Sequence, residues 1–108
     1  MSAEFFINFE DEGWFEENRA CIADAIRELE MFMREEPGVF YLRGTEGEGE
    51  PDRWWYDVRI FIDPAPPMRL EMSAHPPSVE RDVSGLLNKL REHTRIRVDD
   101  EDGEPATW

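Results

Sequence analysis

The two histidines and the single cysteine are the side chains in this sequence best suited to acid–base or nucleophilic chemistry. His75 stands beside two prolines, His93 lies near the end of a predicted helix, and Cys21 lies at the edge of a helical apolar stripe. A hydrolytic triad needs a nucleophile, a histidine and an orienting acid, and the nucleophile-elbow pattern G-x-S-x-G does not occur. No base near Cys21 in the sequence would turn its thiol into a nucleophile, so we expect it to pack as a small apolar side chain. The sequence therefore predicts a protein that is not an enzyme.

Runs of carboxylates are the second possible source of chemistry, because oxygen ligands bind calcium. The run "EGEGEPD", residues 46–52, has acids at alternate positions, and "DDEDGE" covers residues 99–104. Aligning Gly103 with the glycine of an EF-hand loop puts Val98 at the first ligand position, and the sequence stops before the twelfth. One cysteine allows neither an internal disulfide nor a multi-cysteine zinc site. We therefore predict no metal site and no cofactor.

Charge is the strongest bulk feature of the chain. It carries 26 acidic residues against 12 basic ones, a formal net charge of −14. Such a field repels nucleic acid phosphates and anionic lipid and attracts cationic surfaces, so we expect no direct nucleic acid binding, no membrane binding and a basic protein partner. We also expect a cytoplasmic protein, because the first residues, "MSAEFF", do not have the form of a secretory leader and no apolar run approaches the roughly 20 residues of a membrane span.

A chain of 108 residues that is 40% hydrophobic is long enough to bury one core, so we predict a single domain over residues 1–108. Apolar residues recur with helical spacing in two segments and alternate with polar residues in the others. The predicted elements are, in order, a strand over residues 4–10, a helix over 14–36 ended by Pro37-Gly38, strands over 39–43, 54–63 and 68–73, a helix over 78–93 with Ser78 as its N-cap, and a strand over 94–98. An acidic tail follows at about residues 99–108.

This order, β-α-β-β-β-α-β, predicts an α+β fold: a two-layer sandwich with two helices on one face of a mainly antiparallel sheet. Its longest loop, at about residues 44–53, is expected to be a mobile acidic link within a hairpin. In the strand that follows, alternation places Trp54 and Tyr56 on the covered face with Val58 and places Trp55 on the outer face with Asp57. Trp55 then either packs on neighbouring strands or anchors a partner.

Three acidic clusters, each bordered by tryptophan, are the expected partner-binding surface, at the first turn of the first helix, in the hairpin loop and in the tail. The candidate residues are Glu10, Asp11, Glu12, Trp14, Glu46, Glu48, Glu50, Asp52, Trp55, Asp99, Asp100 and Asp102. If the clusters converge in the fold, they form a patch that steers a basic protein, while the aromatic rings supply affinity.

In size, acidity and element order the whole chain resembles the small immunity proteins of bacterial toxin systems, such as those of contact-dependent growth inhibition. The resemblance implies a protein that blocks a cognate toxin domain, often a basic nuclease, and it assigns no individual residue a role. Two alternatives stay open. A nucleic-acid mimic would space its carboxylates along a ridge like phosphates, and a small enzyme or metal protein would hold a histidine or a carboxylate cluster in a concave pocket.

Overall fold

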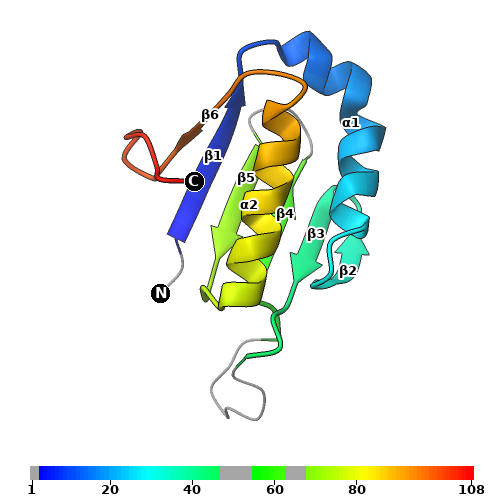
Figure 1. Cartoon of the computed structure of the whole chain (residues 1–108), viewed down its shortest axis with the longest axis vertical. Coiled ribbons are helices and arrows are strands. Elements are labelled where there is room, and N and C mark those ends of the chain that lie inside the picture. Colours follow the sequence, from blue (N-terminus) through cyan, green and yellow to red (C-terminus); the bar gives the residue numbers. More distant parts are fainter. Residues whose placement is uncertain (1–2, 47–54, 63–67) are drawn as a thin grey trace.

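The computed structural model describes residues 3–46, 55–62 and 68–108, which form one six-stranded sheet and two helices (Figure 1). The elements are β1 (Ala3–Phe9), α1 (Glu12–Arg27), β2 (Phe32–Glu36), β3 (Val39–Leu42), β4 (Val58–Phe61), β5 (Met68–Met72), α2 (Pro77–Arg91) and β6 (Ile96–Asp99). The strand order across the sheet is β2-β3-β4-β5-β1-β6, and every neighbouring pair is antiparallel. The predicted α+β class is confirmed, with one strand more than expected.

The helix predicted over residues 14–36 is shorter than its apolar stripe. Asp11 caps α1, and its Oδ1 accepts a hydrogen bond from the Trp14 amide at 3.1 Å. The helix ends at Arg27. A side chain of α2 stabilises the turn that follows, because the Met31 amide donates to Oδ2 of Asp82 at 2.7 Å. The prediction of a continuous helix was wrong: residues 32–36 form strand β2 instead.

Pro37 and Gly38 form the two-residue turn that joins β2 to β3. Glu36 pairs with Val39 across this turn, and Gly38 has a φ of 76°, which glycine adopts without steric cost. The Pro-Gly signal therefore marks a hairpin rather than the end of a helix.

The core lies between the sheet and the two helices, which cover the same face (Figure 1). Paired positions across the sheet supply one row of it: Phe40 lies opposite Ile60, Ile60 opposite Leu70, and Leu70 opposite Phe5. The apolar stripes of α1 and α2 supply the other side. The buried positions predicted in β5 and α2 are confirmed; they are Met68, Leu70, Met72, Val79, Val83, Leu86, Leu87 and Leu90.

Two local predictions failed next to β4 and α2. Tyr56 does not share the covered face with Val58, because the chain bends before β4 begins; its ring lies 5.3 Å from that of Tyr41. Ser78 is not the N-cap of α2, since Pro76 takes that position with no side-chain hydrogen bond and the helix starts at Pro77.

The predicted mobile loop and the predicted acidic tail are both held in place where they are described. Gly44 is buried, and its amide donates to Oδ2 of Asp57 at 2.8 Å, so the start of the 44–53 loop is fixed. In the tail, Asp99 forms an isolated bridge with Pro105, and Trp108 packs against the core. No helix in the described part of the chain is long and apolar enough to cross a bilayer.

Candidate protein-binding surfaces

The face of the sheet opposite the helices carries a group of aromatic and arginine side chains. Arg34 pairs with Tyr41 and Tyr41 with Arg59, so alternation puts these three side chains on this open face. Tyr41 and Tyr56 are buried, yet neither belongs to the core cluster between sheet and helices. Trp55 completes the group, which we call the Trp55 cluster: Arg34, Tyr41, Trp55, Tyr56 and Arg59.

Ring and cation–π contacts hold Trp55 within this cluster. Its ring centroid lies 4.7 Å from that of Tyr41 and 4.8 Å from that of Tyr56, and Cζ of Arg34 lies 5.5 Å from it. The side chain nevertheless remains 43% exposed. Trp55 therefore packs on neighbouring aromatic side chains, as one of the two expectations had it, and still presents an aromatic surface to solvent.

Polar contacts fix the two flanks of the cluster. The Tyr41 hydroxyl donates to Oε1 of Glu36 at 2.5 Å, and this hydrogen bond together with burial raises the pKa of Tyr41. Arg59 is paired with Glu71 of β5 and also lies over the ring of Tyr56. The cluster is therefore preorganised, with its side chains held before any partner arrives.

The predicted acidic residues of the β1–α1 connection come together as expected. Glu10, Asp11 and Glu12 are exposed and line one open hollow of about 760 Å³. Trp14 is only half-buried, but it is not a free anchor, because its ring stacks between Phe9 at 6.2 Å and His93 at 6.2 Å.

The other predicted acidic residues lie elsewhere. Glu46 binds Ser78 at the start of α2, at the opposite end of the sheet from the β1–α1 connection (Figure 1). In the tail, Asp99 is 6% exposed and accepts hydrogen bonds from Asn8 and Arg97, while Oδ1 of Asp100 accepts from the Asp102 and Glu104 amides. The candidates Glu48, Glu50 and Asp52 lie outside the described residues, and so does Trp54, which was expected on the covered face.

The three described acidic groups therefore do not converge on one patch, because they belong to opposite ends of the sheet and to its β6 edge. Asp102 is exposed, whereas Asp99 is buried and its carboxylate is already hydrogen-bonded within the fold. The described acidic surface that stays compact is the one around Glu10, Asp11 and Glu12.

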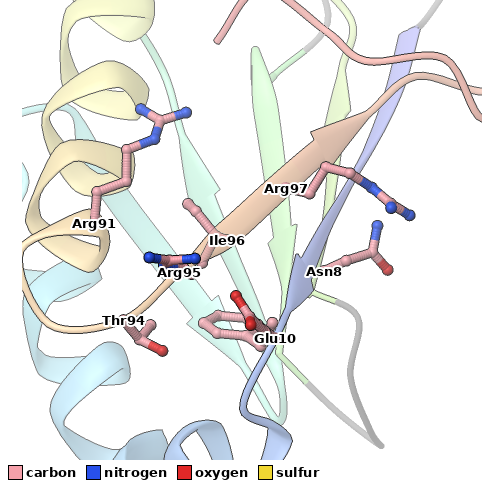
Figure 2. A pocket seen from close by; sticks show the side chains of 8 residues that line it. Asn8, Glu10, Arg91, Thr94, Arg95, Ile96 and Arg97 are labelled. Carbon is pink, nitrogen blue, oxygen red and sulfur yellow. The ribbon is translucent and has the colours of Figure 1, made fainter.

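A second hollow, of about 690 Å³, adjoins this acidic one and has the opposite charge (Figure 2). The two share Phe9, Glu10, Thr94 and Arg95. The lining of the second hollow is completed by Asn8, Arg91, Ile96 and Arg97. An acidic side and an arginine side therefore meet at Arg95.

Among the side chains considered for catalysis, Cys21 and His93 line the same groove, and His75 is not among the described residues that line it. Cys21 is exposed, rather than packed as expected, and lines a small groove of about 200 Å³ between α1 and α2 together with Trp14 and His93. His75 lies 3.4 Å from Glu80 on the surface of α2. Within the described ranges, no group of three or more histidine, cysteine or carboxylate side chains is placed to hold a metal ion.

Sequence reasoning did not assign Arg34, Tyr41 and Tyr56 to the cluster on the open face, because residues 32–36 were assigned to a helix and the strand of Tyr56 was extended too far. The arginines at the β6 edge could have been predicted to share one face, since Arg95 and Arg97 alternate with Ile96 and Val98. Comparison with protein-family models, with curated proteins and with solved structures finds no match to this chain.

Proposed function

We propose that this chain is a cytoplasmic binding protein that neutralises a basic protein partner, in the manner of an immunity protein that blocks a nuclease-like toxin domain. The observation that carries the proposal is the Trp55 cluster on the uncovered face of the sheet. Tryptophan, tyrosine and arginine are the residues that dominate binding energy at protein interfaces. Here two tyrosines support an exposed tryptophan, with Arg34 over the Trp55 ring and Arg59 over the ring of Tyr56.

The net charge supports a basic partner rather than a nucleic acid. A formal charge of −14 accelerates encounter with a cationic protein, and the exposed carboxylates around Glu10 and Glu12 contribute to that field. Association would then use long-range attraction for encounter and the Trp55 cluster for affinity. This separation of roles does not require the acidic groups to converge.

The experiment that tests the proposal is capture on the immobilised protein from a lysate of its source, with an immobilised Trp55→Ala column as the control. We expect the wild-type column to retain a basic protein at moderate salt, the control column to lose it, and the purified pair to show inhibition of the partner's activity at equimolar ratio. If the wild-type column retains no protein even at low salt, the proposal is wrong. If the retained protein is released by added DNA or RNA, the chain is a nucleic-acid mimic instead.

A further inference from the structure

Strand β6 forms one edge of the sheet, and its outer side is only partly covered. The Glu10 amide donates to the Arg95 carbonyl at 3.1 Å, so the peptide groups of Arg95 face β1. Alternation then turns the peptide groups of Ile96 and Val98 outward. The Val98 carbonyl accepts from the Ala106 amide at 2.8 Å, whereas no hydrogen bond within the described part of the chain engages the outward groups of Ile96.

Arginine side chains surround this uncovered stretch. Arg95 and Arg97 extend from the same face of the strand, and Arg91 approaches from the end of α2 (Figure 2). The described residues that line the hollow include three arginines and one carboxylate, a local formal charge of 3 − 1 = +2 in a chain whose total is −14. The part of the β6 edge that borders this hollow is therefore locally cationic on an anionic protein.

The hydrogen bonds of these arginines leave charge available for a ligand. Arg91 donates to Asn88 and to the Trp108 carbonyl. The Arg97 side chain is 71% exposed although its Nε donates to Asp99, and exposed Arg95 has no ion pair with any described residue. Among the residues that the structure describes, Glu10 is the one carboxylate that lines the hollow.

We propose that residues 94–97 bind an extended acidic peptide segment, which adds to β6 as a further strand. The outward amide and carbonyl of Ile96 offer the main-chain pairing that such addition uses. Side chains two residues apart share one face of a strand, so Arg95 and Arg97 select a segment with carboxylates two residues apart.

Other occupants fit this edge less well. Pairing of β6 with β6 of a second copy would set these arginines against each other, which is destabilising. A small inorganic anion would use the guanidinium groups but leave the Ile96 peptide groups unpaired. This edge site is separate from the Trp55 cluster and does not depend on the function proposed above.

The probe is a labelled, end-blocked peptide of sequence Thr-Val-Glu-Val-Glu-Val-Thr, with the isomer Thr-Val-Glu-Glu-Val-Val-Thr as its matched control. Binding to the intact protein is measured by fluorescence anisotropy. We expect the alternating peptide to bind more tightly than its isomer, and Arg95→Glu to weaken that binding about fivefold, the scale of one exposed ion pair. The matched variant Arg81→Glu, which carries the same charge change on an exposed position of α2, should leave binding unchanged, whereas Glu10→Gln should strengthen it.

A second variant tests strand addition itself. Ile96→Pro removes the outward amide at an edge position, where proline is tolerated, and should abolish binding. Unchanged binding by this variant would overturn strand addition, and so would displacement of the peptide by an excess of inorganic phosphate. Equal affinity for the two peptides, an equal effect of Arg81→Glu, or no saturable binding by the wild type would overturn the site as a whole.

Discussion

The carboxylate of Glu46 accepts hydrogen bonds from both the amide and the hydroxyl of Ser78, which lies 32 positions later in the chain. A residue of the acidic loop thereby satisfies an amide in the first turn of α2, where Pro76 offers no side-chain cap. Gly44 lies at the same place, and its amide binds buried Asp57. This small network joins the end of β3, the start of β4 and the start of α2.

Gly44→Ala should destabilise the fold. A Cβ at this position would lie 2.6 Å from Oγ of Ser78 and 2.9 Å from Cγ of Pro76. Relief of that crowding should cost about 1–3 kcal/mol in the free energy of unfolding, measured by urea denaturation. Gly85→Ala is the matched control, because its Cβ would meet no atom within 4 Å and alanine favours a helix; we expect it to stabilise by up to ~1 kcal/mol. Equal effects of the two substitutions would contradict the crowding at Gly44.

Glu46 should make stability depend on pH. The Ser78 hydroxyl, with further help from backbone hydrogen bonds, holds the pKa of Glu46 below its ordinary value of 4.5. A carboxyl whose pKa is lowered by folding stabilises the fold above its unfolded pKa, and that contribution is lost as the pH falls through the folded value. The difference in unfolding free energy between wild type and Glu46→Gln should therefore be largest at neutral pH and shrink below pH 4.5. Glu17→Gln, which removes one charge from an exposed site on α1, measures the effect of charge alone.

Trp55→Ala should weaken partner binding while the fold persists. Trp55 is exposed and is not a member of the core cluster. Truncation of an interface anchor of this kind costs about 2 kcal/mol, or roughly thirtyfold in Kd. Met33→Ala is a close control, since Met33 is 41% exposed and Trp55 is 43% exposed. Calorimetric titration with the captured partner should show the loss for Trp55 alone. A similar loss for Met33, or none for either, would move the interface away from the cluster.

Asp82→Ala should loosen strand β2. The carboxylate receives the Met31 amide at 2.7 Å, and removal of a charged acceptor from such a bond costs about 1.5–3 kcal/mol. Hydrogen exchange should then accelerate in residues 31–36 more than in β1 or β5. Ser84→Ala, at an exposed position on the same helix, serves as the control. Uniform acceleration across the sheet would contradict a local role for Asp82.

The same hydrogen bond explains why one strand escaped prediction. Phe32 and Met33 continue the apolar spacing of α1, and no glycine or proline separates them from Arg27. The helix ends before Met31 because Asp82 binds the Met31 amide and β3 pairs with the residues that follow. Local sequence patterns do not predict such tertiary contacts. Segments with one clear period, such as β5 and α2, were predicted correctly for the complementary reason.

The candidate surface was predictable only in part. Alternation correctly placed Trp55 away from the covered face. Tyr56 was expected on the covered face, but the bend before β4 puts its ring against that of Trp55. The acidic residues near Glu10 were grouped correctly because they are neighbours in sequence. Convergence of distant clusters depends on strand order, which single-sequence patterns do not specify.

The position of β1 determines when the sheet can be completed during synthesis. Its partners are β5 and β6, so Phe6 pairs with Arg69 on one side and with Asp99 on the other. Contacts between such distant parts of a chain slow folding, because loop closure precedes their stabilising effect. A nascent chain therefore carries β1 without a partner until residues 68–72 have been made, and both edges of β1 are covered only once residues 96–99 have followed.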